Sequence, residues 1–379
     1  MIAKWYPYPE DPQFGVFIQK HAEAIAIDNK VVVLFAHSIA NLPVKYQFDI
    51  SQKENLFEII ISFRKDESAF ANLINGLRYF SAIRKGVKKG QTFFLKPDLI
   101  HAYILLRTAV VANYLSLILK VPYVVNEQWS GYATGKFSEG NFVKKALTKF
   151  LVKRSSGLVS VSNFLLDKIH ACGISNENEK VIPNSIEVIA NSNITNKEKV
   201  NVLLVADQVD EIKNISAVIR CVASIKDSSP DFELRIIGQG KDKEMLIEIA
   251  RELGVLNSNV IFEGLKSNPE VYQYLQKSDF LVMNSRFETF SLICCEALSC
   301  GKPVLATRCG GPQEFIDDEV GVLIDVDDDV QLAKKFHFML THYNQFDSQK
   351  IISKVKDRFS KETVKKLYGE FYKKALGDD

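Results

Sequence analysis

Short apolar runs alternate along most of the chain with longer segments in which apolar residues recur every three or four positions. The short runs predict strands and the longer segments predict helices. Regular alternation of the two predicts parallel sheets and an α/β fold class. The expected strands are Ile2–Trp5, Val31–Ala36, Leu56–Phe63, Pro97–Tyr103, Pro122–Asn126, Gly157–Val161, Val200–Ala206, Phe232–Gly238, Val260–Glu263, Asp279–Met283, Val304–Ala306 and Gly321–Ile324.

Helices are expected between most of these strands. A polar, Asn/Ser/Thr-rich stretch without apolar periodicity, Ile189–Lys199, is the expected linker. With 379 residues the chain is long enough for two domains, which we place at residues 1–188 and 189–360. The expected helices include Val16–Ile27, Ala69–Lys88, Ile104–Lys120, Asn141–Arg154, Lys241–Leu253, Pro269–Lys277 and Lys361–Leu376.

Composition restricts the class of protein. Hydrophobic residues make up 46% and charged residues 25%, as in ordinary soluble proteins, and a net charge of +2 gives no reason to expect nucleic acid as a partner. The six cysteines lack paired metal-ligand spacing, so we expect reduced core residues and no metal site. The N-terminus has neither a signal-like nor a membrane-spanning apolar run, so we expect a cytoplasmic protein rather than a periplasmic sugar-binding one.

The stretch from Asn284 to Pro303 carries the clearest chemistry. Its helical part, from Leu292 to Cys300, is apolar on nearly every side, which predicts a buried helix that ends at Gly301. One acid, Glu296, lies inside this helix, and a buried carboxylate needs hydrogen-bond donors. Glu288 precedes it by eight residues, about two helical turns, so both carboxylates can face one side, ~12 Å apart along the axis.

A helix N-terminus is expected between these two acids. Its free backbone N–H groups favour anionic oxygens such as those of phosphate. The stretch therefore offers an anion site flanked by two acceptors for hydroxyl groups. A nucleotide sugar carries hexose hydroxyls, a diphosphate and ribose hydroxyls in that order.

The Glu288-x7-Glu296 spacing, with a strand before it and a Gly-Lys-Pro-Val strand after it, resembles the signature of retaining GT-B glycosyltransferases of family 4, group 1 type. The resemblance implies two Rossmann-like doubly wound parallel-sheet domains that face each other across a cleft. It also implies that Glu288 lies by the donor sugar and that Glu296 holds the ribose hydroxyls. The backbone of Phe290, Ser291 and Leu292 would contact the phosphates and the sugar. The helix 361–376 would cross back onto the first domain.

Three further positions of the second domain match this family. Lys213 matches a lysine that neutralises the donor diphosphate, whereas Asp207 or Gln208 stands where the family commonly has an arginine. Gly238 opens a Gly-x-Gly turn; position 243 is lysine rather than a third glycine, so the turn does not fit a dinucleotide fingerprint. The resemblance places Leu265 by the nucleobase.

In the first domain, Gly15 lies in the connection between the first strand and the first helix, and it could let the backbone approach a ligand. Related transferases read Glu-His-Trp-Ser-Gly after a later strand, with the histidine near the reacting sugar. This chain has Gln128 there, which can hydrogen-bond a hydroxyl but cannot titrate. His101 is a weak candidate to substitute for that histidine.

The segment Asn141–Arg154 is a basic amphipathic helix with four lysines and one arginine. A solvated helix face would explain it. Alternatively, it contacts an anionic membrane surface and brings a lipid-linked acceptor within reach, on the inner face of the membrane.

The resulting hypothesis is a retaining glycosyltransferase that moves a hexose from a nucleotide-diphosphate sugar to a glycan or lipid-linked acceptor in polysaccharide synthesis. The base would be UDP or GDP, and the scheme requires no metal or cofactor, because lysine and backbone N–H groups stabilise the leaving group. Two alternatives stay open. The chain could bind nucleotide sugars without catalysis, or it could be a GT-B enzyme of another class, such as a sugar-nucleotide epimerase.

Overall fold

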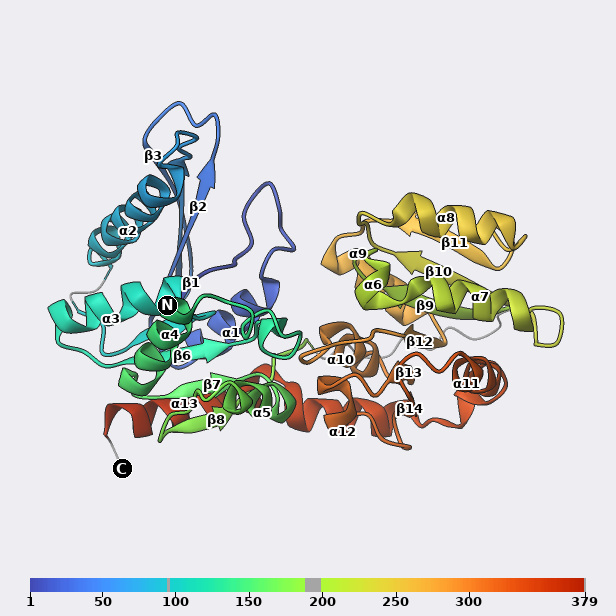
Figure 1. Cartoon of the computed structure of the whole chain (residues 1–379). Helices are drawn as coiled ribbons and strands as arrows, with labels where there is room; N and C mark the ends of the chain where they lie inside the picture. Colours follow the sequence, from blue (N-terminus) through green and yellow to red (C-terminus); the bar gives the residue numbers. More distant parts are fainter. Residues whose placement is uncertain (94–95, 188–198, 378–379) are drawn as a thin grey trace. The chain divides into compact units, whose positions relative to one another are not determined.

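The computed structural model describes residues 1–93, 96–187 and 199–377. The chain divides into two compact units, one formed by Met1–Ser185 with Lys361–Asp379 and the other by Ile186–Ser360. The boundary expected between residues 188 and 189, and the expected linker except for Lys199, lie outside the described residues. Each unit contains a sheet with helices packed on it, so the α/β class is confirmed (Figure 1).

In the described part of the first unit, eight strands form one sheet in the order β3-β4-β2-β1-β5-β6-β7-β8. All neighbouring strands are parallel except β3 and β4. The strands are β1 (Ile2–Ala3), β2 (Val31–Ile39), β3 (Tyr46–Lys53), β4 (Leu56–Arg64), β5 (Ile100–Tyr103), β6 (Tyr123–Glu127), β7 (Leu158–Ser160) and β8 (Glu179–Val181).

Strand β3 has no counterpart among the strands predicted above. Its apolar residues Tyr46, Phe48 and Ile50 alternate with polar ones, but nearly the whole strand is exposed at the edge of the sheet. An edge strand paired on one side only gains little from burial, so its hydrophobic signal is weak.

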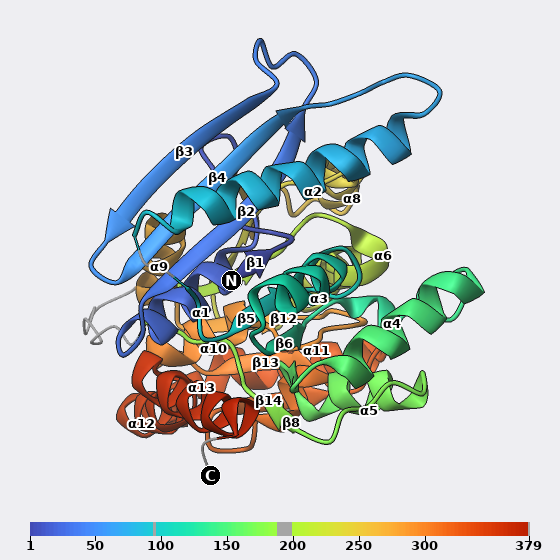
Figure 2. The same cartoon turned by 90° about the vertical axis from the view of Figure 1, so that its left-hand side faces the viewer.

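The helices of the first unit surround this sheet. Helix α2 lies along β2 and β4, as Figure 2 shows, and α13 packs on α1. The helical segments are α1 (Val16–Ala26), α2 (Ala71–Gly90), α3 (Arg107–Leu119), η1 (Ser130–Tyr132), α4 (Phe142–Arg154), α5 (Asn163–Ala171) and α13 (Lys361–Leu376). In the described ranges, no helix has the length and hydrophobicity that a bilayer crossing demands.

Buried hydroxyl and imidazole groups join α13 to the rest of the first unit. Tyr368 on α13 donates to Nδ1 of His21 (2.8 Å) and accepts from Tyr103 (3.1 Å) and Asn126 (2.8 Å). The Nε2 atom of His21 lies 3.1 Å from the carbonyl oxygen of Pro183, which can only accept, so Nε2 carries the proton. These bonds satisfy polar groups that burial would otherwise leave without partners.

The described part of the second unit holds a sheet of six parallel strands in the order β11-β10-β9-β12-β13-β14. The strands are β9 (Val200–Val205), β10 (Phe232–Ile237), β11 (Val260–Gly264), β12 (Phe280–Met283), β13 (Val304–Thr307) and β14 (Gly321–Ile324). The helical segments are α6 (Asp210–Lys213), α7 (Ile215–Ile225), α8 (Lys243–Glu252), α9 (Asn268–Lys277), α10 (Leu292–Ser299), η2 (Gly311–Glu314), α11 (Asp329–His342), η3 (Tyr343–Gln345) and α12 (Ser348–Phe359).

The core of the second unit lies between this sheet and helices α7 and α11, where Phe232, Phe280 and Phe336 are fully buried. Strand order reverses beside β9, because β10 lies on one side of it and β12 on the other. Ligands of open α/β sheets bind at such a reversal, beyond the carboxyl ends of the strands. The segments that follow β9, β10 and β12, with helices α6 and α10 included, contain most of the predicted site residues.

Candidate active site

Lys213 and Glu288 form an ion pair at the carboxyl edge of the second sheet. The Nζ atom of Lys213 donates to Oε1 of Glu288 at 2.6 Å, and Ser285 Oγ donates to the same oxygen at 2.9 Å. Burial lowers the pKa of Lys213, but the charge and hydrogen bond of Glu288 outweigh it, so the pKa is raised overall. With 22% and 17% of these two side chains exposed, the pair is held in place yet open to a ligand.

The backbone of Glu288 is fixed by the loop after β13. Its N–H donates to the carbonyl oxygen of Cys309 (3.2 Å), and its own carbonyl accepts from the N–H of Gly311 (2.9 Å). Helix α10 begins only at Leu292, four residues after Glu288. The two-turn spacing of ~12 Å between Glu288 and Glu296 therefore does not apply, because three of the seven intervening residues precede the helix.

Ser291 precedes α10 in a strained conformation. Its φ of 75° lies in the left-handed region, which costs a residue with a side chain about 1–2 kcal/mol. Its Oγ atom is buried, its partner among the described residues is the weakly hydrogen-bonding thiol of Cys294, and no side chain caps the helix. A buried hydroxyl with so weak a partner, beside the free N–H groups of a helix N-terminus, is suited to an anionic oxygen.

Glu296 lies in the second turn of α10 and is almost completely buried. After burial, its charge is the next cause of the raised pKa of Tyr272 on α9, so the two side chains are neighbours. The structure thus places Glu296 in the helix interior, where the sequence put it.

The glycines of the Gly-x-Gly turn allow two loops to pack backbone to backbone. Gly238 has a φ of 136°, and a Cβ atom there would lie 1.9 Å from the carbonyl oxygen of Ala206. A Cβ at Gly240 would lie 2.4 Å from that of Gln208. Gln208 is itself fully buried, and its amide donates to the Gly238 carbonyl (3.2 Å), so it does not replace the missing arginine.

The other predicted contacts of this unit differ in exposure. Leu265, the residue predicted to lie by the nucleobase, follows Gly264 and is exposed. Phe290 is buried and packs against Phe315 and Phe359, so only its backbone is available to a ligand. Leu292 opens α10 and is half-buried.

Arg286 is a residue of this site that the sequence analysis did not identify. Its guanidinium donates to the carbonyl oxygen of Asp210 (2.8 Å), to Asn214 Oδ1 (2.8 Å) and to Asp327 Oδ1 (2.7 Å). It therefore fixes the α6 turn that presents Lys213. The signal was a charged residue shortly after a buried strand, where a charge needs partners.

In the described residues, no group of three or more His, Cys, Asp or Glu side chains is arranged to hold a metal ion. Asp210, at the start of α6, accepts from the N–H (2.7 Å) and Oγ (2.6 Å) of Ser216. This is helix-capping chemistry.

The first unit holds Gly15 and Gln128. Gly15 has a φ of 68°, and a Cβ there would lie 2.5 Å from the backbone carbonyl carbon of Trp5. This close packing explains why position 15 is a glycine. Gln128 is buried, and its amide donates weakly to Asn126 Oδ1 at 3.4 Å. The loop around it is fixed by Glu127, whose carboxylate accepts from the N–H groups of Gln128 and Trp129, both at 2.8 Å.

His101 cannot substitute for the histidine that Gln128 replaces. It lies near the start of β5, at the opposite edge of the sheet from the ligand-binding carboxyl ends. Burial holds its pKa well below the ordinary value, and its Nδ1 atom lies 2.7 Å from the hydroxyl of Tyr372 on α13. Its surroundings are those of a structural histidine.

Comparison with known proteins identifies the family. The Glycosyltransferase Family 4 profile matches residues 17–188, and the profile of Glycosyl transferases group 1 matches residues 188–357. An N-acetylgalactosaminyltransferase of Campylobacter jejuni that acts on a diphospho-undecaprenol-linked saccharide is 29% identical over 245 residues, 60% of this chain and 64% of that protein. The N-acetyl-alpha-D-glucosaminyl L-malate synthase of Bacillus anthracis is 25% identical over 62% of this chain and 63% of its own length. Less than two thirds of either relative is spanned.

Solved structures share the fold. Sucrose-phosphate synthase of Thermosynechococcus elongatus superposes with a TM-score of 0.77 at 16% identity, over 96% of this chain and 94% of that one. Anabaena HepE, solved with UDP and glucose, gives a TM-score of 0.74 at 18% identity over 98% of each chain. Together with the profile matches, these likenesses show that the chain belongs to the group 1, family 4 glycosyltransferases of the GT-B fold.

Proposed function

We propose that this chain is a retaining glycosyltransferase that moves a hexose from a nucleotide-diphosphate sugar to a glycan or lipid-linked acceptor. The observation that carries the proposal is the Lys213–Glu288 pair next to Ser291, whose buried Oγ is left with only the weak thiol of Cys294 as a partner among the described residues. A cation, a carboxylate and an open helix N-terminus thus meet at one strand edge. Each matches one part of a nucleotide sugar.

Lys213 and the first N–H groups of α10 would act on the diphosphate. In the transfer, the bond between the anomeric carbon and the diphosphate oxygen breaks, and its electron pair leaves with the nucleotide. A new bond forms from the anomeric carbon to the acceptor hydroxyl oxygen, whose proton goes to the departing diphosphate oxygen. Lysine and helix N–H groups stabilise the negative charge on the leaving oxygen without a metal.

Glu288 would hold the sugar and Glu296 the ribose. Glu288 already accepts from Lys213 and Ser285, so a sugar hydroxyl can donate to its remaining lone pairs. The same carboxylate keeps Lys213 charged. Arg286, through the α6 turn, fixes the position of the amine and serves as a positioning residue.

Relatives support a sugar acceptor on a lipid or a glycan. The Campylobacter jejuni relative acts on a diphospho-undecaprenol-linked saccharide, and a galactosyltransferase of the lipopolysaccharide outer core shares the fold with a TM-score of 0.67. For this chain we propose an acceptor of the same kind, with a role in polysaccharide synthesis.

The test is a thermal-shift and hydrolysis screen over UDP-glucose, UDP-N-acetylglucosamine and GDP-mannose, with Glu288→Gln as the matched control. We expect one donor to raise the melting temperature of the wild-type chain and to be slowly hydrolysed, with hydrolysis lost in the variant. Binding without hydrolysis or transfer to any acceptor would favour the non-catalytic alternative. Conversion of the donor into an epimerised sugar would favour the epimerase.

A further inference from the structure

A pocket of about 250 Å³ lies in the first unit, beyond the carboxyl ends of β5 and β6. Four lysines line it: Lys4 follows β1, Lys136 precedes α4, and Lys144 and Lys145 lie in the first turn of α4. Trp129 adds an aromatic wall. The volume is several times the roughly 30 Å³ that one water molecule occupies in the liquid, so the pocket can hold a polar group larger than water.

The charge of this lysine pocket is strongly positive. Its lining contains one carboxylate, that of Glu127, which is fully buried. Glu127 accepts from backbone N–H groups of Leu105 (3.1 Å), Gln128 and Trp129 (both 2.8 Å). Its carboxylate is therefore engaged in holding the backbone of the loop. In the described residues, Lys4, Lys136, Lys144 and Lys145 form no ion pair, and Lys145 donates only to the carbonyl of Ser138 (2.8 Å).

The backbone at the wall of the pocket is strained. Ile104 and Leu106 have φ values of 66° and 74°, in the left-handed region that β-branched and bulky residues avoid. Both line the pocket immediately before α3, which begins at Arg107 with no side-chain cap. The first N–H groups of α3 therefore add to the positive potential of the lysines.

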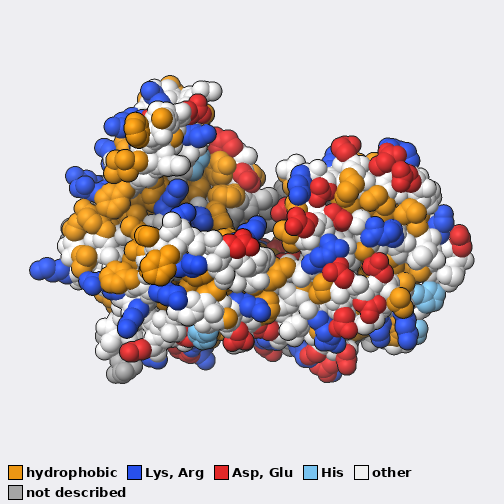
Figure 3. Space-filling view, in the orientation of Figure 1, with side chains coloured by type: hydrophobic (Ala, Val, Ile, Leu, Met, Phe, Trp, Pro, Cys, Tyr) orange, Lys and Arg blue, Asp and Glu red, His pale blue; other side chains and the backbone are white. Residues whose placement is uncertain are grey.

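Helix α4 also carries an apolar surface away from this pocket. Phe142, Val143 and Phe150 are 79%, 68% and 54% exposed. Figure 2 shows α4 projecting from the body of the unit, and Figure 3 shows apolar side chains interspersed with lysines and arginines over this face. Exposed aromatic residues next to lysines on one helix are typical of a helix that lies in the interface of a membrane.

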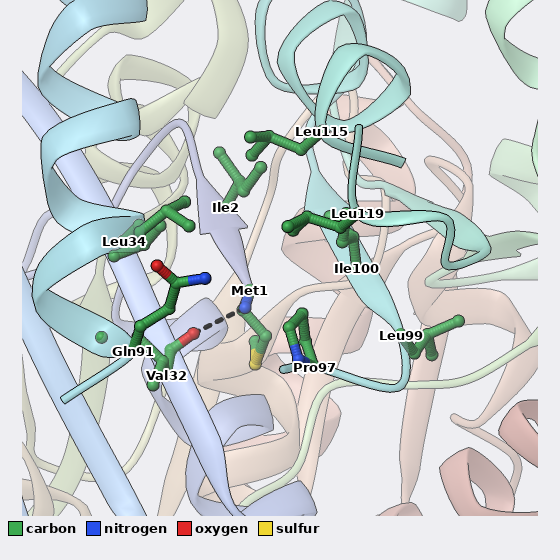
Figure 4. Close-up of a pocket in the computed structure, with 12 residues that line it drawn as sticks. Met1, Ile2, Val32, Leu34, Gln91, Pro97, Leu99, Ile100, Leu115 and Leu119 are labelled. Carbon is green, nitrogen blue, oxygen red and sulfur yellow. Dashed lines mark hydrogen bonds between the residues drawn. The ribbon is translucent and has the colours of Figure 1, made fainter. Parts of the chain in front are cut away.

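A second cavity of the first unit lacks these features. Figure 4 shows it between β1, β2 and α3, with an apolar lining that includes Leu34, Leu115 and Leu119. Its volume is only about 70 Å³. It is a packing gap of the core, whereas the lysine pocket combines charge, strain and an exposed apolar neighbour.

We propose that the lysine pocket binds the phosphate or diphosphate group of a lipid whose hydrocarbon chain lies in a membrane, while Phe142, Val143 and Phe150 rest in the membrane interface. The inference rests on the proposed function, because this lipid is the acceptor. Phosphate oxygens match the lysine ammonium groups and the α3 N-terminus. The exposed apolar residues of α4 can contact a membrane that holds the lipid, whereas they would not contribute to binding a soluble phosphate.

Vesicle flotation tests this inference with the full chain. The vesicles are phosphatidylcholine alone, phosphatidylcholine with a polyprenyl diphosphate, and phosphatidylcholine with phosphatidylglycerol at equal charge. We expect the strongest binding to the polyprenyl diphosphate vesicles. The double substitution Lys136→Ala/Lys144→Ala should weaken that binding at least about tenfold, because each lysine near an anionic surface contributes severalfold.

Matched variants separate the pocket from general surface effects. Lys373→Ala/Lys374→Ala removes two exposed lysines of α13, and Val330→Ser removes an exposed apolar residue of α11; both should float like the wild type. Phe142→Ser/Phe150→Ser should lose binding to all three kinds of vesicle. Equal binding to phosphatidylglycerol and polyprenyl diphosphate, or wild-type binding by Lys136→Ala/Lys144→Ala, would overturn the proposal.

Two further arms identify the source of the phosphate. Inorganic diphosphate should compete with the polyprenyl diphosphate vesicles; if it stabilises the chain thermally without displacing it from them, the pocket serves a soluble phosphate and the lipid proposal is wrong. Donor hydrolysis by the wild type is measured in parallel. Vesicle binding without donor hydrolysis would contradict the proposed function but support the lipid site. Donor hydrolysis without vesicle binding would support the proposed function and contradict the lipid site.

Discussion

Lys213 and Glu288 are 75 positions apart in the sequence, yet the Nζ atom of Lys213 lies 2.6 Å from Oε1 of Glu288. The contact joins the turn after β9 to the loop after β12, two neighbouring strands of the sheet. Glu288 keeps Lys213 charged, and the hydrogen bond between them fixes both side chains. A ligand with both hydroxyl and phosphate oxygens can use the pair without having to order it first.

Glu288→Gln should lower turnover by about 10²–10³-fold, the range found when one preorganised polar group is removed from an active site. Glutamine keeps the shape but leaves Lys213 without its counter-charge. Lys213→Met should cause a similar loss. In the double variant the two losses should not add, because each single change already breaks the pair. Steady-state kinetics with the donor found by screening would measure this, and additive losses would contradict the coupling.

Ser291 gives a prediction in which stability and affinity separate. Ser291→Gly should relieve the left-handed strain and raise the melting temperature, with a net gain of at most about 1 kcal/mol after the greater chain entropy of glycine. Ser291→Ala keeps that strain. Both variants lack the hydroxyl, so both should bind the donor about tenfold or more weakly if Oγ donates to a phosphate oxygen. Titration calorimetry with donor would decide, and wild-type affinity in Ser291→Ala would exclude that bond.

Gly238→Ala should destabilise the second unit by at least about 3 kcal/mol, since its Cβ would collide with the Ala206 carbonyl at 1.9 Å. The control is Gly369→Ala in the middle of α13, where a Cβ meets nothing within 4 Å. There alanine should stabilise the helix by about 0.5–1 kcal/mol. Scanning calorimetry of the two variants would measure both changes. A mild effect at Gly238 would mean that the 206–208 loop can move away.

The sequence predicted those features that depend on local pattern. Strand β12 is buried along its whole length and gives a continuous apolar run, and α10 is recognisable because it is apolar on nearly every side. The family, the GT-B fold and the apolar helix that holds Glu296 were therefore accessible and are confirmed.

Features that depend on distant partners were not accessible. Between Asp207 and the start of α7 the structure has the short helix α6, which ends at Asn214 with a φ of 48°. Arg286 fixes α6 by contacts that span 72 to 76 positions. Phe290, next to the left-handed Ser291, is likewise held by residues far away in sequence, because it packs against Phe315 and Phe359. Such interactions leave no periodic signal.

From the burial of His21 we predict that acid lowers the free energy of unfolding of the first unit. Complete burial lowers its pKa from 6.5 to about 4. The unfolded chain therefore takes up a proton more readily than the folded one between these values, so the stability contribution is present above pH 6.5 and is lost as the pH falls toward 4. A shift of this size corresponds to about 3 kcal/mol at most. Buried His101, whose pKa is also lowered, acts in the same direction.

Both tryptophans of the chain, Trp5 and Trp129, lie in the first unit, so their fluorescence reports the unfolding of that unit alone. Urea unfolding curves between pH 5 and 7.5 should show the free energy of unfolding of the wild type falling with acidity. His21→Gln can keep a donor for Pro183 and an acceptor for Tyr368 but cannot titrate. This variant should start less stable at neutral pH and lose less on acidification. Parallel curves for the two proteins would assign the acid sensitivity to other groups, because only the removal of the titrating imidazole distinguishes them.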